Sequence, residues 1–277
     1  MESAYKISKF NLEEDLYKDN GFFVIVVGKS RSGKGCYSHN LLEKMIKNKL
    51  LKVKNAYLFS SSADVQPDSF SCIKHNRYTQ YDDKFVLKIV EDNGNIIKHQ
   101  ISKGKTKKQA IEDNGLLFIV DDLASGDIHR SKSLLLLATA GRHKACNVIL
   151  LTQALASAVN TRVRKNASMI VAYPSISHKV MELLIREYGL MSLGGMSFKE
   201  ARQFLMNLWQ SKPYTALCIL QHKTDIRRFE DMIRFDRVST DPVKTIKYLN
   251  KKTLDKKHNK PNDNVKSIFR KKNKRYT

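Results

Sequence analysis

The sequence has 277 residues, 42% of them hydrophobic, which is enough for one large domain with a sizeable core. Its 50 lysines and arginines outnumber 27 acidic residues and give a formal net charge of +23, which attracts polyanions such as nucleic acid. Four widely separated cysteines without a Cys-x-x-Cys pair argue against a zinc site or a disulfide framework, and no apolar run reaches the roughly 20 residues that span a membrane.

The two ends of the chain differ in charge from the middle. Residues 1–20 hold three lysines and five acidic residues and are expected to be a short N-terminal lead-in. Residues 243–277 hold thirteen lysines and arginines against two aspartates, and are expected to form a disordered basic tail. One folded domain is therefore predicted over residues 21–242. The chain starts without a signal-peptide pattern, and reduced thiols indicate a cytosol-like compartment.

A buried strand is predicted at residues 22–27, where six apolar residues run directly into a glycine. The next seven residues read G-x-x-x-x-G-K and lead into a helical pattern, which is the context of a phosphate-binding loop. Glycine lets backbone N–H groups surround phosphate oxygens, and the lysine adds a positive charge. Without that context, a glycine-bearing turn would be the simpler interpretation. The residues predicted to bind nucleotide are Gly28, Lys29, Ser30, Arg31, Ser32, Gly33, Lys34, Gly35 and Cys36.

Gly35 departs from the usual pattern of such loops. The residue after the lysine is normally serine or threonine, and its hydroxyl holds Mg²⁺. The sequence leaves Ser32, Ser38 or a water molecule open as substitutes for that hydroxyl. It also leaves open a degenerate site that binds nucleotide without hydrolysing it.

Apolar patterns alternate between strands and helices along the rest of the chain. The expected strands are residues 55–60, 116–120, 147–152, 168–173 and 214–221. The expected helices are residues 38–50, 128–140, 154–165, 176–188 and 197–210. Residues 82–90 and 95–111 fit two helices better than a hairpin turning at Asn93-Gly94, and Lys98–Lys108 is expected to be basic and flexible. The alternation predicts an α/β fold with a mainly parallel sheet flanked by helices.

Polar side chains follow two of the predicted strands, at the sheet edge where ligands bind in such folds. Asp121 and Asp122 come directly after one apolar run, and Gln153 follows another. A carboxylate there can hold Mg²⁺ and a second can activate water, although a helix cap or a turn also explains such acids. Gln153 suits the positioning of water, and Arg142 suits the neutralisation of transition-state charge across a subunit interface. Taken alone, each of these two residues is better explained as a strand-end amide or a surface charge.

The order of three motifs, GKSRSGKG, LLFIVDDL and AGRHKACNVILLTQ, resembles the viral genome-packaging ATPases of the FtsK–HerA superfamily. These include the poxvirus-type packaging ATPases and their relatives in large DNA viruses and virophages. The most specific part is the Gly-Arg-His step before an apolar strand that ends in Thr-Gln. The resemblance covers about residues 20–175, with weaker support to about 240. It implies a P-loop NTPase domain of the RecA/ASCE type over residues 21–242.

By this resemblance, Lys34 binds the β- and γ-phosphates of ATP. Asp121 holds Mg²⁺, and Asp122 activates the attacking water. Gln153 is the sensing amide, and Arg142 is the arginine finger. Two weaker candidates for a finger or a DNA contact are Arg162 and Arg164.

The resemblance also implies an ATP-driven motor that packages double-stranded DNA into a viral capsid. The expected partners are duplex DNA, further copies of the chain in a pentameric or hexameric ring, and a capsid or portal vertex protein. No membrane is expected among the partners. The expected location is the host cytoplasm, in the viral factory, and the virion. The alternatives are a helicase-like or conjugative DNA pump of the same superfamily, and a non-hydrolysing nucleic-acid-binding or capsid-docking protein. Lys98–Lys108 and the tail are candidate phosphate contacts, whereas His143 and Trp209 are expected to be structural.

Overall fold

The computed structural model describes residues 11–12, 16, 21–48, 51–64, 70, 72–121, 128–173, 177–188, 197–211, 215–221 and 233–237. The strands are β1 (Phe23–Val27), β2 (Ala56–Ser60), β3 (Arg77–Tyr78), β4 (Leu116–Asp121), β5 (Cys146–Thr152), β6 (Met169–Ala172), β7 (Thr215–Leu220) and β8 (Ile233–Arg237). The helices are α2 (Lys34–Lys47), α3 (Asp83–Ser102), α4 (Lys107–Asp113), α6 (Lys132–Ala140), α7 (Leu155–Ala158), α8 (Thr161–Asn166), α9 (His178–Glu187) and α10 (Phe198–Ser211). Two 3-10 turns are η2 (Val53–Asn55) and η3 (Gly141–Lys144).

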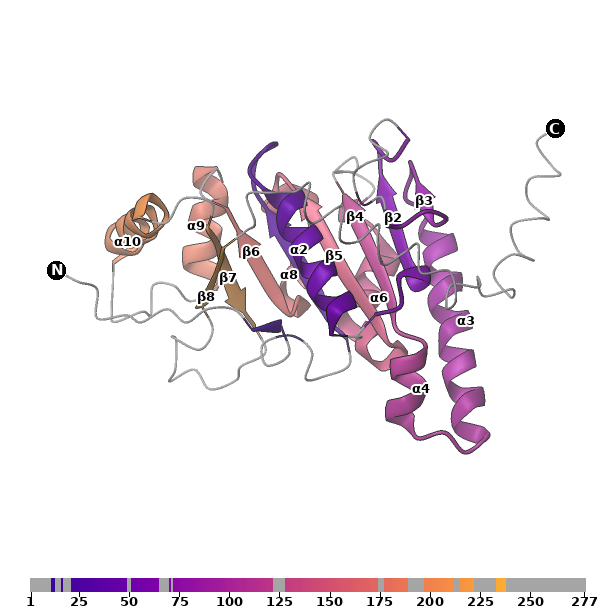
Figure 1. Ribbon diagram of the computed structural model, residues 1–277. Coiled ribbons are helices and arrows are strands. Elements are labelled where there is room, and N and C mark those ends of the chain that lie inside the picture. The colour runs from indigo at the N-terminus through magenta and orange to yellow at the C-terminus, as the bar shows by residue number, and fades with distance from the viewer. Residues whose placement is uncertain are drawn as a thin grey trace.

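The described strands form one eight-stranded sheet in the order β3-β2-β4-β5-β1-β6-β7-β8, with helices on both faces (Figure 1). The strands from β3 to β6 pair in parallel, and β7 and β8 add an antiparallel edge. The predicted α/β fold with a mainly parallel sheet is therefore confirmed, and it is a P-loop NTPase fold. The carboxyl edge is defined here as the edge where β1, β4, β5 and β6 end, and the amino edge as the edge where they begin.

The sheet separates two hydrophobic layers. Helix α2 packs Tyr37, Leu41 and Met45 against one face, and Leu12 and Leu16 from the N-terminal segment join the same layer. Helices α3, α6, α9 and α10 cover the other face. All five residues of β1 are buried, because both faces of that strand are covered. Trp209 of α10 is also buried in this core, as expected for a structural residue.

Helix α3 corrects the prediction for residues 82–111. It runs without a break through Asn93 and Gly94 and ends at Ser102, so the chain turns ten residues later than expected. Asn93 is buried, and its amide donates hydrogen bonds to the carbonyl oxygens of Asn114 (3.1 Å) and Lys144 (2.9 Å). Asn93 therefore serves to hydrogen-bond these distant carbonyl groups and lies within the helix rather than in a turn. The expected flexible segment, Lys98–Lys108, instead ends one helix and begins the next.

Other differences are smaller. Helix α2 begins at Lys34 rather than residue 38, because it follows the phosphate-binding loop without a gap. Strands β3 and β8 were not expected from the sequence. The predicted tail and the domain boundary at residue 242 lie outside the described residues. Over the part of the chain that the structure covers, none of the helices has the length and apolar character needed to cross a membrane.

Candidate functional site

The loop between β1 and α2 has a backbone that requires its glycines. Gly33 has a left-handed backbone, with φ at 103°, which side chains rarely adopt. A Cβ atom on Gly28 would lie 2.5 Å from the Ser32 hydroxyl, and one on Gly33 would lie 3.1 Å from the Tyr173 ring. The loop is thus closely packed around two glycines, directly before the N-terminus of a 14-residue helix. Backbone N–H groups at such a position form an anion site.

Lys34 is the first residue of α2, and the residue is 7% exposed. The ammonium group donates hydrogen bonds to the carbonyl oxygens of Gly28 (2.7 Å) and Lys29 (3.0 Å). The buried cation is therefore satisfied by the loop itself, and it lies where a phosphate held by the loop would need a counter-charge.

The structure narrows the choice of a hydroxyl to replace the one missing at Gly35. The Ser38 hydroxyl is fully buried and donates to the Lys34 carbonyl (3.0 Å), so it faces back into the helix. The Ser32 hydroxyl is buried in the loop and has no hydrogen-bond partner among the described residues. Burial raises the pKa of the Cys36 thiol, so it stays protonated near pH 7 and is a poor ligand for a hard cation. Ser32 or water remain as substitutes.

Position 35 itself has room for a side chain. A Cβ atom there would meet nothing within 4 Å, and the backbone is not left-handed. Gly35 is therefore not required by packing, in contrast to Gly28 and Gly33. The missing hydroxyl is a property of this sequence rather than a consequence of steric crowding.

Two of the predicted polar residues, Asp121 and Gln153, lie at the carboxyl ends of adjacent strands. Strand β5 lies between β1 and β4, so Gln153 follows the strand between the phosphate-binding loop and Asp121. Asp121 is the half-buried last residue of β4 and is level with Leu151 of β5. Successive side chains of a strand point to opposite faces, so Asp121 lies on the same face of the sheet as Ile119. Ile119 packs in the hydrophobic layer that contains α2. Asp122 lies outside the described residues.

Within the described residues, no three His, Cys, Asp or Glu side chains are grouped as a metal site. Asp121 would thus need oxygen ligands from phosphate or water to hold Mg²⁺, which is the usual way in which this ion is bound beside nucleotides.

Tyr173 is a residue of the site that the sequence analysis missed. It follows β6, the strand beside β1, and is fully buried. Its hydroxyl donates to the Gly33 carbonyl (3.2 Å), and its backbone N–H donates to Val27 (3.1 Å). Tyr173 therefore supports the loop from the neighbouring strand. An aromatic residue at the end of an apolar strand before Pro174 was the available signal.

A family model described as Poxvirus A32 protein matches residues 7–220 of this sequence. The chain belongs to the Poxvirus A32 protein family. The match confirms the resemblance to poxvirus-type packaging ATPases that the three motifs indicate. Among curated proteins, none matches this A32-family sequence.

Solved structures resemble the A32-family chain at low sequence identity. The pCW3 conjugation coupling protein TcpA, in its monomer form with ATPγS, is 13% identical with a TM-score of 0.53, over 84% of this chain and 66% of that chain. The genome packaging NTPase B204 from Sulfolobus turreted icosahedral virus 2, in complex with ATPγS, is 15% identical with a TM-score of 0.47, over 78% of this chain and 96% of that chain. EssC (ATPases 2 and 3) from Geobacillus thermodenitrificans is 12% identical with a TM-score of 0.49, over 85% and 43%. The likeness to TcpA shows a shared fold.

A second group that the sequence analysis missed joins the start of α6 to α3 in the A32-family chain. Asp83, in the first turn of α3, accepts hydrogen bonds from the Ser131 hydroxyl (2.6 Å) and the Lys132 N–H (2.9 Å), and also from Ser133. Burial would raise the pKa of Asp83, but the bonds from Ser131, Ser133 and Lys132 together lower it. The carboxylate thus caps α6 and ties it to α3. The available sequence signal for this contact was the pair Asp82-Asp83 at the start of one helix and Ser131-Lys132-Ser133 at the start of another.

The predicted arginines lie away from the loop. Arg142 is exposed in η3, which leads into the start of β5, so it sits at the amino edge of the sheet. The phosphate-binding loop of the same A32-family chain lies at the carboxyl edge, because β1 and β5 are parallel. Arg142 is therefore at the opposite edge of the sheet from the phosphate-binding loop of its own chain. His143 beside it is exposed and has no described metal partners.

Arg164 is not a candidate for a finger or a DNA contact, because it is 4% exposed. Its guanidinium donates to the Val159 carbonyl (2.7 Å) and pairs with Glu187 (3.1 Å). It joins α8 to the end of α9 and is structural. Arg162, two residues earlier on the same short helix, is exposed and remains a candidate for an arginine finger or a DNA contact.

Proposed function

We propose that this chain is an ATP-hydrolysing motor that moves double-stranded DNA into a viral capsid. The observation that carries the proposal is the order of groups at the carboxyl edge in an A32-family chain. The phosphate-binding loop follows β1, Gln153 follows the adjacent β5, and Asp121 ends the next strand, β4. A phosphate cradle, an amide and a carboxylate on three adjacent strands are the groups that nucleotide hydrolysis needs.

The loop fits a nucleotide triphosphate. Its two constrained glycines precede the N-terminus of α2, a position where backbone N–H groups bind phosphate, and Lys34 supplies the charge for the β- and γ-phosphates. Asp121 would hold Mg²⁺, with the unpartnered Ser32 hydroxyl or water in place of the hydroxyl absent at Gly35. Bound Mg²⁺ would neutralise charge on the phosphate oxygens.

Three residues are assigned to the chemistry of hydrolysis. Asp122 acts as the general base that accepts a proton from the attacking water. Gln153 orients that water and senses the γ-phosphate. Arg142 of a neighbouring subunit stabilises transition-state charge. The proposed assembly is a pentameric or hexameric ring around the DNA. A capsid or portal vertex protein would anchor this ring in the viral factory and the virion.

The proposal is tested by measuring Mg²⁺-dependent ATP hydrolysis with and without duplex DNA. We expect turnover that DNA stimulates, and loss of turnover in Lys34→Ala. Because Lys34 is buried against the loop carbonyls, thermal unfolding of that variant must be measured alongside. Absence of turnover in the wild-type protein, or full turnover in a folded Lys34→Ala variant, would refute hydrolysis at this loop.

A mixing experiment tests the role of Arg142. Arg142→Ala subunits retain an intact loop, and Lys34→Ala subunits retain the arginine. If the arginine acts across a subunit interface, rings mixed from the two inactive variants regain part of the activity. Mixed rings without any recovery would show that Arg142 does not act in trans.

The second candidate is a nucleotide-binding protein that does not hydrolyse ATP. Gly35 favours it, because the loop lacks the usual hydroxyl ligand for Mg²⁺ although the position has space for one. Equilibrium binding of ATP without turnover, with or without duplex DNA, would favour this candidate. A helicase-like or conjugative pump would instead hydrolyse ATP and move DNA without a capsid.

A further inference from the structure

The turn between α3 and α4 gathers lysines at the amino edge of the sheet. Residues 98–108, here called the basic hairpin, contain five lysines and no acidic residue. Every residue from 101 to 109 is exposed. Figure 1 shows α3 extending past the ends of the strands, with α4 beside its far end. The basic hairpin is therefore a projecting, positively charged surface on the side opposite the phosphate-binding loop.

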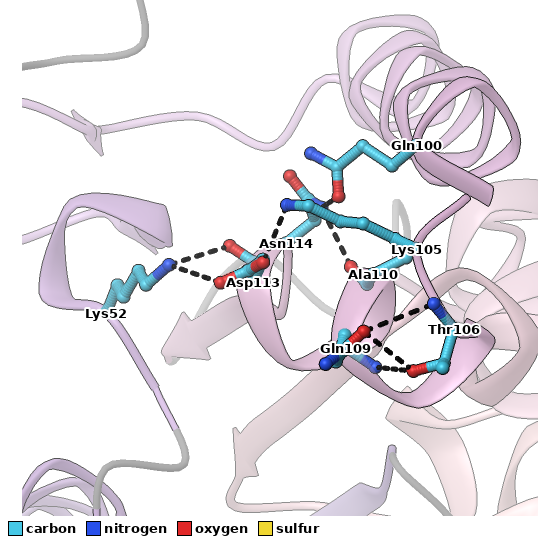
Figure 2. A network of polar contacts seen from close by, with 8 residues as sticks. All are labelled: Lys52, Gln100, Lys105, Thr106, Gln109, Ala110, Asp113 and Asn114. Atoms are coloured by element: carbon cyan, nitrogen blue, oxygen red, sulfur yellow. Dashed lines mark hydrogen bonds and ion pairs between the residues drawn. The ribbon is translucent and has the colours of Figure 1, made fainter. Parts of the chain in front are cut away.

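The basic hairpin is held in one conformation by a polar network (Figure 2). The Asn114 amide donates to Gln100 (2.8 Å) and to the Ala110 carbonyl (2.7 Å), which joins the two helices. Thr106 and Gln109 form a capping box at the start of α4. Gly104, with φ at 91°, makes the tight turn. A surface fixed in this way loses little conformational entropy when it binds a partner.

Asp113 neutralises only one side of the basic hairpin. Its carboxylate pairs with Lys105 (2.9 Å) and Lys52 (3.1 Å), and hydrogen bonds from these two lysines lower its pKa. Lys98, Lys103 and Lys107 are exposed and form no ion pair with any residue that the structure describes. Positive charge thus remains uncompensated on a rigid projection.

We propose that the basic hairpin binds the phosphate backbone of double-stranded DNA without reading its sequence. Lysine ammonium groups act as point charges that suit phosphates and carry no base specificity. The inference rests on the proposed function, which supplies duplex DNA as the polyanion. Helix α3 has 20 residues, so it extends about 30 Å from the Asp83 cap of α6 to the basic hairpin. One helix therefore connects the start of α6 with the proposed DNA contact.

The test compares two variants of the full chain with the same loss of charge. In the first, Lys98, Lys103 and Lys107 are changed to glutamine. In the second, the matched control, glutamine replaces three exposed lysines outside the hairpin, Lys84, Lys179 and Lys199. The basic tail is common to both, so any difference belongs to the basic hairpin. Binding is measured by fluorescence anisotropy with a 30-base-pair duplex over a range of salt concentrations.

We expect the hairpin variant to bind at least tenfold more weakly at about 0.15 M salt, because three phosphate contacts are lost. The plot of log K against log salt has a negative slope, and its magnitude should decrease by roughly 2 to 3, at about 0.9 for each lost phosphate contact. The control variant should keep nearly the wild-type slope. Equal losses in both variants would show that only net charge matters, and an unchanged hairpin variant would overturn the proposal.

Two further measurements separate this proposal from the proposed function. ATP hydrolysis without DNA should be equal in the wild-type protein and both variants, since none of these lysines lies at the phosphate-binding loop. If hydrolysis is absent throughout but the hairpin variant still loses DNA binding, the motor fails and the DNA surface stands. Loss of binding to anionic vesicles or to single-stranded RNA, with duplex DNA binding unchanged, would contradict the inference.

Discussion

The hydroxyl of Tyr173 donates a hydrogen bond of 3.2 Å to the carbonyl oxygen of Gly33. Tyr173 follows β6, and Gly33 precedes α2, so the contact ties the phosphate-binding loop to the strand beside β1. Gly33 has a left-handed backbone and no side chain of its own to hold it in place. The orientation of the loop therefore depends on packing from a neighbouring strand.

The first prediction concerns the Tyr173 hydroxyl. In Tyr173→Phe the ring stays and one hydrogen bond is lost, which is worth about 1 kcal/mol. We expect ATP affinity to weaken about fivefold, because the loop must then be ordered by the nucleotide itself. Tyr57→Phe is the control, since it removes a hydroxyl from a buried tyrosine of β2, away from the loop. Titration with a fluorescent ATP analogue measures both, and equal affinities would contradict the prediction.

The second prediction concerns the space at Gly35. Gly35→Ser places a hydroxyl where the loop usually has one, and nothing lies within 4 Å of the added Cβ. We expect half-maximal ATP hydrolysis at a lower Mg²⁺ concentration than in the wild-type protein. Gly35→Ala is the matched control, because replacing glycine in a helix should stabilise either variant by about 0.5 to 1 kcal/mol. The same Mg²⁺ dependence in both variants would show that the hydroxyl does not reach the ion.

Much of the site could be predicted from the sequence because its signals are local. The six apolar residues before Gly28 are typical of a strand buried on both faces, and the glycines and Lys34 follow at once. The apolar runs before Asp121 and Gln153 are equally continuous. Parallel strands that all end in polar residues bring those residues to one edge of the sheet. Neighbouring residues in the sequence were thus sufficient to locate the candidate site.

The contacts that the sequence did not reveal join residues far apart in the chain. Tyr173 and Gly33 are separated by 140 positions, and Asp83 and Ser131 by 48. Asn93 was read as part of a possible turn, because its partners, the carbonyl groups of Asn114 and Lys144, come from later segments. Arg164 was a candidate for function because a buried ion pair has no local signature. The role of each of these residues depends on contacts with segments that are distant in the sequence.

The third prediction concerns Arg164, whose guanidinium is buried against Glu187 and the Val159 carbonyl. In Arg164→Met the Val159 carbonyl loses its donor and the partly exposed Glu187 carboxylate loses its partner, which should cost roughly 1 to 3 kcal/mol of unfolding free energy. Arg162→Met, on the exposed side of the same helix, should change stability by less than about 0.5 kcal/mol. Urea unfolding measures both. Similar midpoints for the two variants would show that the ion pair contributes nothing.

The fourth prediction rests on His39, which follows the phosphate-binding loop on α2. Its Nε2 atom accepts a hydrogen bond from the Phe70 N–H (3.2 Å), and its ring stacks on the Phe70 ring at 4.3 Å. Burial lowers the pKa of His39 from its usual value of 6.5 to about 4. The folded protein thus keeps this imidazole neutral across a range in which the unfolded chain protonates it.

Between pH 6.5 and 4 the unfolded chain binds a proton at His39 that the folded chain does not, so stability should fall as the pH falls. The full loss is on the order of 3 kcal/mol, and none of it is expected above pH 6.5. His39→Gln keeps an oxygen acceptor for the Phe70 N–H but does not titrate, so its unfolding free energy should change much less over this range. Urea unfolding at pH 6.5, 5.5 and 4.5 measures the difference. Parallel pH profiles for the two proteins would show that His39 is not the group responsible.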